Sequence, residues 1–568
     1  MYKYNFHVIF SALLLFLNVG CSDPKTNHVP VANAGVDISV PFGEEITLDG
    51  SFSEDTDEDT LNYEWKITKK PKDSNVTLNA NNIERPRFTA DLVGVYSFSL
   101  VVDDGTDSSS ADNVNVTVFK SGSGQIIVPS SGVQADNEIF MPASTTLYAQ
   151  EMLVILLSYN DVKIKATKTV WENKMFGDTQ KGELNHYYNT VSQNQFGFKA
   201  VQDAGLVSNG VVRVDFNYPH PGSSTQTDVL TATTALYNEL DNALKQIVSD
   251  GFSFSPYDHD GDGQVSRNEL SIVFIIAGEE EAYNNKLIKG VWAHSGCIQG
   301  GVQPDVTEKR LLDCNKNGNY VVFGENHYEA INDFHTATVG IIAHELGHGV
   351  FELPDLYFNS YSRIGQYGLM SFGSWGVASQ NEKPGETPTH MTPWSKIQTG
   401  WYTAQQTHSD ENTTLTLYAT DDTAYNIIKI PLLNSTHEYF LLENRGTSGY
   451  DEALSMVKKQ GNYVGGVAIW HIDDDVISAN TESNRVNASA SHKGIDLEEA
   501  AGLSNDAYES DGEPELNLYY NGNVDAFTPN SRPSTNLYNG SVTYLFVSEI
   551  STSGSQMSLK INNPSAKP

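Results

Sequence analysis

Residues 336–351 read Thr-Ala-Thr-Val-Gly-Ile-Ile-Ala-His-Glu-Leu-Gly-His-Gly-Val-Phe, and this stretch decides the interpretation of the chain. His344 and His348 are four positions apart, so on a helix both imidazoles leave one face, as two ligands of one zinc ion do. Glu345 follows the first histidine, within reach of a water held at such a metal. The other helix positions are mostly apolar, and burying these polar side chains without partners would cost about 1–3 kcal/mol each. A metal site removes that cost; a structural cluster of hydrogen-bonded side chains is the alternative.

A catalytic zinc ion needs a third protein ligand and one open coordination position. The sequence has no suitable glutamate in a helical pattern about twenty residues downstream, where thermolysin-type enzymes carry theirs. Instead it continues at once as Glu352-Leu353-Pro354-Asp355. Pro354 ends the helix and would turn Asp355 back towards the histidines. Asp355 is therefore the expected third ligand, with Glu352 as the alternative.

The stretch from Ala343 to Tyr357 resembles the immune inhibitor A-type secreted metallopeptidases, which are relatives of the metzincins. Residues 367–376, Tyr-Gly-Leu-Met-Ser-Phe-Gly-Ser-Trp-Gly, look like the methionine turn of that family, with Met370 beneath the zinc. The resemblance implies an α/β, metzincin-like zinc protease domain, which we place at 131–404. It also implies the roles of the site residues: His344, His348 and Asp355 hold zinc, and Glu345 is the general base.

One position departs from the metzincin pattern. Metzincins carry a glycine three residues after the second histidine, where the chain turns, and Phe351 stands at that place here. We therefore expect this helix to end in a different way.

A second metal motif lies upstream and is independent of the first. Residues 258–269 read Asp-His-Asp-Gly-Asp-Gly-Gln-Val-Ser-Arg-Asn-Glu, the pattern of a twelve-residue calcium loop with Gly263 at its sharp turn. The expected ligands are Asp258, Asp260, Asp262, the carbonyl of Gln264, Ser266 directly or through water, and Glu269. Because the loop leads into the predicted central strand 271–277, we expect calcium to fasten it to the core. A paired regulatory EF-hand lobe is the alternative, but the sequence shows no second such loop.

The regions on either side of this body are predicted to be β-structured. Strand-sized segments separated by Gly, Asp, Ser and Pro predict a small β-sandwich at 30–118. Residues 30–118 resemble the PKD-type domain through short motifs such as Pro-Val-Ala-Asn-Ala-Gly (30–35) and Tyr-Glu-Trp (63–65). This resemblance implies a spacer or adhesion module. A flexible linker is predicted at 119–130, and short alternating runs predict a β-rich region at 405–568. The predicted fold class is thus multidomain: a PKD/Ig-like β-sandwich, the α/β protease domain and a β-rich C-terminal region.

The N-terminus and the cysteines indicate export. Residues 1–20 combine Lys3 with a short apolar run, which predicts a secretory signal peptide. Cys21 lies where a bacterial lipoprotein carries its lipid, although Asn18 replaces the usual leucine; an ordinary signal peptide is the alternative. Cys297 and Cys314 are then an isolated pair, for which one disulfide is the simplest state outside the cell; two free buried thiols are the alternative. We expect an exported protein, either secreted or bound to the bacterial cell envelope through this lipid anchor alone.

The net charge of the chain indicates which kinds of binding partner to expect. The 568 residues contain 35 Lys and Arg against 71 Asp and Glu, a net charge of −36. This argues against nucleic-acid binding, which needs clustered cations, and suits calcium. The expected function is a zinc-dependent endopeptidase acting on proteins or peptides, with matrix or cell-surface contact through the PKD-like domain. The alternative is a non-catalytic surface adhesion protein on a degenerate peptidase fold, and the intact Glu345 argues against it.

Overall fold

The computed structural model describes residues 27–35, 38–41, 45–57, 59–72, 74–92, 94–119, 148–202, 207, 209–220, 229–259, 261, 263–280, 290–296, 320–328, 334–359, 361–407, 413–432, 435–456, 463–500 and 517–562. The chain divides into two compact units, Met1–Ser121 and Gly122–Pro568. Within the described residues, no helix has the length and apolar character needed to cross a bilayer. Cys21, Cys297 and Cys314 lie outside the described residues, as do Asp260 and Asp262.

The first unit is built from two small sheets that share one apolar core. Its strands are β1 (Ile38–Pro41), β2 (Glu45–Thr47), β3 (Asn62–Lys69), β4 (Arg87–Thr89), β5 (Gly94–Asp103) and β6 (Asp112–Phe119). One sheet has the order β1-β6-β5-β3, and β2 pairs with β4. Tyr96, Phe98, Leu100 and Val102 of β5 are fully buried, because alternate side chains of a strand point to the same face. They pack with Trp65, so the predicted β-rich N-terminal region is confirmed.

The second unit begins with an eight-stranded sheet and four helices. They are β7 (Tyr148–Ser158), α1 (Lys168–Phe176), α2 (Leu184–Val191), β8 (Phe196–Ala200), β9 (Val211–Asp215), α3 (Val229–Ser249), β10 (Ser271–Glu280), β11 (Gly290–Val291), β12 (His294–Gly296), β13 (Tyr320–Tyr328), β14 (Phe334–Thr336) and α4 (Val339–Phe351). The main path runs β12-β13-β10-β7-β8, and β7, β8, β10 and β13 are parallel. Every residue of β10 is buried, as expected for a central strand covered on both faces.

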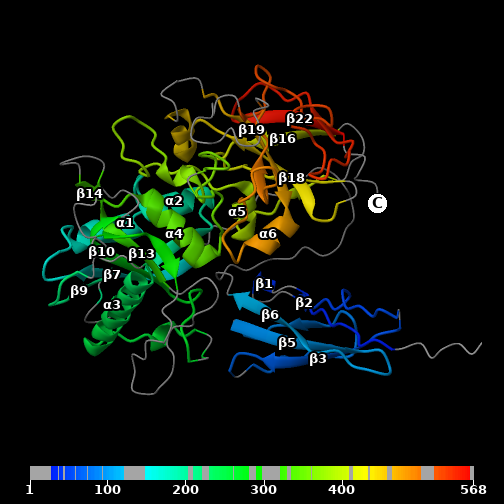
Figure 1. Cartoon of the computed structure of the whole chain (residues 1–568), viewed down its shortest axis with the longest axis horizontal. Coiled ribbons are helices and arrows are strands. Elements are labelled where there is room, and N and C mark those ends of the chain that lie inside the picture. Colours follow the sequence, from blue (N-terminus) through cyan, green and yellow to red (C-terminus); the bar gives the residue numbers. More distant parts are fainter. Residues whose placement is uncertain are drawn as a thin grey trace, which may run out of the picture. The chain divides into compact units, whose positions relative to one another are not determined.

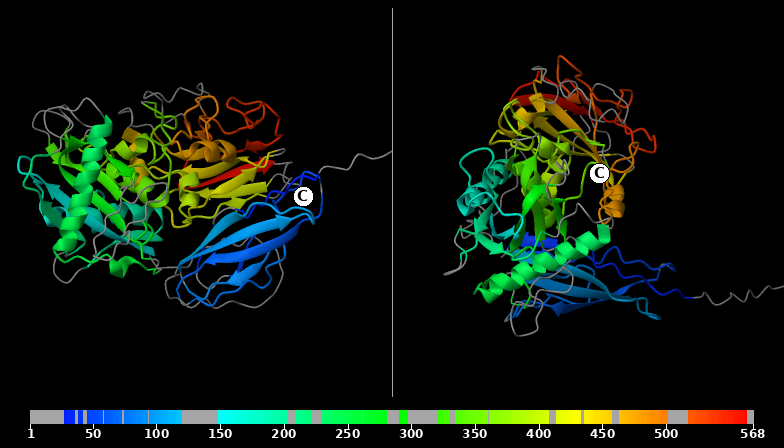
Figure 2. Two further views of the ribbon diagram at one scale, coloured as in Figure 1. Left: turned by 60° about the horizontal axis from the view of Figure 1, so that its bottom comes forward. Right: turned by 60° about the vertical axis from the view of Figure 1, so that its left-hand side comes forward.

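Helices cover both faces of this sheet (Figure 1). Trp171 of α1 contacts Phe323, whereas Tyr237 of α3 contacts Tyr320, and these two β13 positions point to opposite faces. The views in Figure 2 show α3 lying along its face of the sheet. The other face carries α1, α2 and α4, so α4 lies between the sheet and the C-terminal part of the chain. β12 pairs only with β13 among the described strands and forms the edge of the sheet beside α4.

The C-terminal part contains two further sheets. Its elements are α5 (Pro393–Gln398), β15 (Gln405–Gln406), β16 (Thr413–Tyr418), β17 (Ile428–Pro431), β18 (Glu438–Arg445), β19 (Gly466–Asp473), α6 (Asp474–Asn480), β20 (Ile495–Leu497), β21 (Phe546–Ser548) and β22 (Gln556–Asn562). The sheet β15-β17-β18-β19-β20 is stacked on the sheet β16-β22-β21. The predicted β structure after residue 405 is therefore present.

The larger C-terminal sheet buries both of its faces. Leu441 and Trp470 belong to the same core as the central sheet and α4. Phe440 and Val467, which point the opposite way, belong to a second core with the three-stranded sheet. Since one core runs from β7 to β20, the larger C-terminal sheet is built onto the α/β half of the second unit.

Candidate metal centre

Helix α4 carries both histidines and is buried along nearly its whole length. Its residues from Val339 to Gly347 are all buried, which explains the apolar composition around His344 and Glu345. A Cβ added at Gly347 would meet Sδ of Met370 at 2.5 Å, so only glycine lets this methionine pack directly against the helix. Met370 is 1% exposed and lies at the helix surface between the two histidine positions. Met370 therefore packs directly against α4, and its role as a methionine turn stays a prediction.

The end of α4 explains how the chain turns without glycine at position 351. The helix includes Phe351, and Glu352 adopts the left-handed conformation with φ of 56°. Its N–H donates to the carbonyl of His348 at 3.2 Å, and Leu353 N–H donates to Gly347 at 3.1 Å. These two bonds close the helix as a C-terminal capping motif does. The chain therefore reverses one residue later than in the metzincin pattern and brings Asp355 back to the helix.

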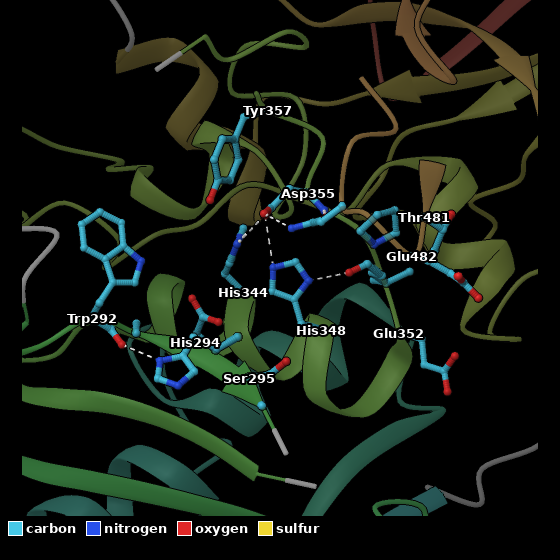
Figure 3. A pocket seen from close by; sticks show the side chains of 16 residues that line it. Trp292, His294, Ser295, His344, His348, Glu352, Asp355, Tyr357, Thr481 and Glu482 are labelled. Carbon is cyan, nitrogen blue, oxygen red and sulfur yellow. Dashed lines mark hydrogen bonds and ion pairs between the residues drawn. The ribbon is translucent and has the colours of Figure 1, made fainter. Parts of the chain in front are cut away.

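Three side chains converge at this point. The Nε2 atoms of His344 and His348 each lie 3.1 Å from Oδ1 of Asp355, and the three ligand atoms lie within 4.8 Å of one another. In Figure 3, Asp355 faces both imidazole rings. Glu352 does not join them: its side chain is 53% exposed and pairs with Arg267. Of the two predicted third ligands, the structure brings only Asp355 to the histidines.

The orientation of the two imidazole rings tests whether the cluster fits a metal ion. Nδ1 of His344 lies 2.9 Å from the carbonyl of Leu369, and Nδ1 of His348 lies 2.5 Å from the carbonyl of Leu353. A carbonyl can only accept, so each Nδ1 carries the proton and a neutral ring presents its bare Nε2 to Asp355. Acceptors then face an acceptor, which is unfavourable unless a cation lies between them. This donor set fits a metal ion.

The pKa shifts at this cluster have an electrostatic cause. Burial opposes protonation of His348, but the charge of Asp355 and its hydrogen bond raise the pKa of His348 to about 9. Burial acts against ionisation of Asp355 too, yet the two histidines hold the pKa of Asp355 well below its usual range. Both pKa shifts arise because a positive charge on the histidines and the negative charge of Asp355 stabilise each other.

The cluster opens into a cavity of about 350 Å³. One wall is the segment 292–296, which includes edge strand β12, and Trp292 at its start is 61% exposed. Glu345 lines the floor and is 7% exposed. Thr481, Glu482 and Asn484 form another wall, although they follow the histidines by more than 130 positions. The cavity is therefore bounded by both halves of the second unit.

Two side chains at this site were not predicted as functional. The ring of Tyr357 lies 6.1 Å from that of His344, and burial, together with Asp355 and Glu345, raises the pKa of Tyr357, which keeps its hydroxyl protonated. Asn484 hydrogen-bonds Asp355 from a distant part of the chain. Tyr357 could have been suspected from its place two residues after the third ligand. Nothing in the sequence around Asn484 indicates its role.

The predicted calcium loop is described only in part. Asp258 Oδ2 accepts from Gly263 N–H at 2.9 Å, and Glu269 accepts from the N–H groups of His259 and Ser266, both at 2.7 Å. Oδ1 of Asp258 is buried and has no hydrogen-bond partner among the described residues. Gln264 and Gly263 lie in the same turn, with φ of 85° at Gly263. The described carboxylates thus face the inside of the loop.

The fold and the site define a multidomain protein with a β-rich N-terminal domain and an α/β body that carries a buried cluster of two histidines and one aspartate. Residues 159–402 match the family described as immune inhibitor A peptidase M6, catalytic domain, and residues 34–118 match a family of PKD domains. The chain therefore carries a PKD-type domain followed by a metallopeptidase domain of the immune inhibitor A type, as the sequence predicts.

The solved structures that resemble part of this chain include two PKD domains. The PKD domain of the KIAA 1837 protein is 32% identical, covering 19% of this chain and 99% of that one, with a TM-score of 0.15. The PKD domain of human KIAA0319 is 27% identical over 20% and 99%, with a TM-score of 0.16. A nucleoside hydrolase-related hypothetical protein from Saccharophagus degradans is 22% identical over 16% of this chain, which spans only 26% of that protein, with a TM-score of 0.15.

Proposed function

We propose that this protein is an exported, zinc-dependent endopeptidase with a metzincin-like catalytic domain. The observation that carries the proposal is the convergence of two imidazole Nε2 atoms and one carboxylate oxygen at the floor of an open cavity. Two histidines and one carboxylate are a known catalytic zinc set, and the cavity leaves the fourth position accessible. Tetrahedral zinc with bonds of about 2.0–2.1 Å keeps its ligand atoms roughly 3.3 Å apart, close to the observed 3.1 Å.

Zinc at this site would polarise a peptide carbonyl and make water nucleophilic near neutral pH. Glu345 is the carboxylate beside the ligands, and we assign it the role of general base: it takes the proton of the attacking water and passes it to the leaving amine. The Tyr357 hydroxyl, which stays protonated because its pKa is raised, is a further hydrogen-bond donor at the cavity. Edge strand β12 can pair with an extended peptide, which would place a protein substrate across the cavity.

The proposal includes two features that rest mainly on sequence. Calcium would bind in the loop 258–269, and the inward-facing carboxylates of Asp258 and Glu269 support this. Signal peptide 1–20 and lipidated Cys21 would export the protein and attach it to the cell envelope, with Cys297 and Cys314 forming a disulfide there.

The Glu345→Gln variant tests the mechanism. Glutamine has the same size but cannot accept a proton, so we expect casein hydrolysis to fall by at least about 10²–10⁴-fold while zinc remains bound, because Glu345 is not a ligand. Elemental analysis of both proteins should give one zinc per chain, and the same measurement reads calcium. Hydrolysis by the parent should stop when a zinc chelator is added.

Glu172→Gln on helix α1 is the matched control, since it removes a carboxylate outside the cavity. It should digest casein like the parent. Full activity of Glu345→Gln would disprove the assigned mechanism, and inactivity of the zinc-loaded parent would favour the adhesion alternative.

A further inference from the structure

We propose that Asn484, from the C-terminal part of the chain, positions the third metal ligand, so that the metal centre is complete only when residues 480–488 are docked against it. This inference rests on the proposed metal site and adds a residue from outside the matched peptidase segment 159–402. It concerns how the site is held in place and not the identity of its ligands.

The two oxygens of Asp355 have different partners. Oδ1 faces both histidine Nε2 atoms at 3.1 Å, whereas Oδ2 accepts a hydrogen bond from the Asn484 side-chain amide. The same amide accepts a hydrogen bond through Oδ1 from the backbone N–H of Asp355 at 2.6 Å. Asn484 thus hydrogen-bonds both the backbone and the carboxylate of Asp355. This leaves one defined oxygen to face the metal position.

Each of the three ligands has its own orienting hydrogen bond. Those of His344 and His348 come from the carbonyls of Leu369 and Leu353, both within the catalytic half. The corresponding partner of Asp355 lies 129 positions downstream. Such partners fix the geometry of a metal ligand and contribute to affinity. Asn484 therefore orients Asp355, just as the backbone carbonyls of Leu369 and Leu353 orient the two histidines.

The position of Asn484 is itself well defined. It has φ of 53°, a left-handed conformation that asparagine tolerates better than most residues, in the turn that follows α6. Asn487, which is fully buried, donates to the carbonyl of Leu356 at 3.2 Å and to that of Ile495 in β20 at 2.8 Å. Arg485 lies over the ring of Phe358 at 5.0 Å. These contacts hold the turn against the segment that carries Asp355.

A merely structural contact between the two segments would leave metal affinity unchanged. Asn484→Gly separates the two cases, because glycine keeps the left-handed backbone but removes both hydrogen bonds to Asp355. In the full-length protein we expect zinc affinity, measured by competition with a chromogenic chelator, to fall about 10–100-fold. The rate of zinc release should rise correspondingly.

Asn484→Ala provides a second variant with the same missing side chain but an added backbone strain. Equal loss of zinc affinity in both variants assigns the effect to the hydrogen bonds. Asn209→Gly and Asn209→Ala are matched controls, since Asn209 is an exposed asparagine with φ of 52° in a remote turn. They should bind zinc like the parent.

Zinc affinity of Asn484→Gly within twofold of the parent would overturn the inference and leave the proposed function intact. A parent protein that binds no zinc would instead overturn the proposed function. The measurement needs no substrate, so loss of catalysis for another reason cannot imitate the expected result.

Discussion

The second unit contains two clusters of similar composition but opposite chemistry. The first consists of His344, His348 and Asp355, and the second of His437, Glu438 and Asp473; in each, three ligand atoms lie within 4.8 Å. In the first cluster both Nδ1 atoms contact backbone carbonyls, so both Nε2 atoms turn towards Asp355. In the second, His437 Nδ1 lies 2.9 Å from Asp473 and His492 Nε2 lies 2.7 Å from it, so donors meet an acceptor.

The second cluster is satisfied without a metal. Asp473 also caps helix α6, accepting from the N–H of Asp475 at 3.0 Å. Next to it, His471 lies between Glu438 at 3.0 Å and Glu498 at 3.1 Å. The comparison shows that composition and proximity do not identify a metal site. What distinguishes the first cluster is that backbone carbonyls occupy both Nδ1 atoms, which leaves both Nε2 atoms facing one carboxylate oxygen.

The sharpest test of this comparison is to remove one histidine from each cluster. Structural zinc binds with about 10 kcal/mol or more, so loss of one of three ligands in His348→Ala should cost roughly 3 kcal/mol, which is over a hundredfold in affinity. His437→Ala should retain one zinc per chain and the activity of the parent. Elemental analysis after dialysis and a casein assay measure both. Loss of zinc in His437→Ala would mean that the two clusters had been distinguished wrongly.

Much of the first cluster could be predicted from sequence because its determinants are local. The spacing of His344 and His348, the stop at Pro354 and the position of Asp355 all lie within one helix and its following turn. Even the departure at Phe351 pointed to a changed helix end, and the structure shows the reversal at Glu352. The central strand expected at 271–277 is present for the same reason, since its apolar composition indicates it.

The contribution of the C-terminal part could not be predicted in this way. Asn484 reaches Asp355 only because β18 and β19 pack one face onto the catalytic half, and that packing depends on contacts far apart in sequence. The buried Arg445 illustrates the same limit. It pairs with Asp451 and donates to the carbonyl of Tyr367, three residues before Met370, yet in the sequence it reads as an ordinary charged residue.

A second test addresses the ion pairs beside the second cluster. Burial opposes protonation of His471, but Glu438 and Glu498 raise the pKa of His471 to about 9, above its ordinary value of about 6.5. The folded state therefore binds this proton more tightly, and the stabilisation is fully present below about pH 6.5 and is lost as pH rises through about 9. His471→Gln removes one partner of a buried pair and should lower the free energy of unfolding by about 3–5 kcal/mol near pH 6.5.

Denaturant titrations of parent and His471→Gln between pH 6 and pH 10 measure this effect. The difference between them should shrink through the upper half of that range, while zinc content stays unchanged. A constant difference at every pH would show that His471 contributes through packing, for instance its stacking on Tyr538, and not through its charge.

The smallest expected effect concerns His437, which is partly exposed, in contrast to the buried His471. The hydrogen bond to Asp473 raises the pKa of His437, but the His437 side chain is 36% exposed, so solvent weakens the ion pair. His437→Ala should therefore lower the free energy of unfolding by less than about 1 kcal/mol at pH 6, and this difference should fade as the pH rises and His437 loses its proton. A cost of several kcal/mol that appears only when a divalent metal is supplied would contradict this, because only a bound ion makes an exposed histidine so important.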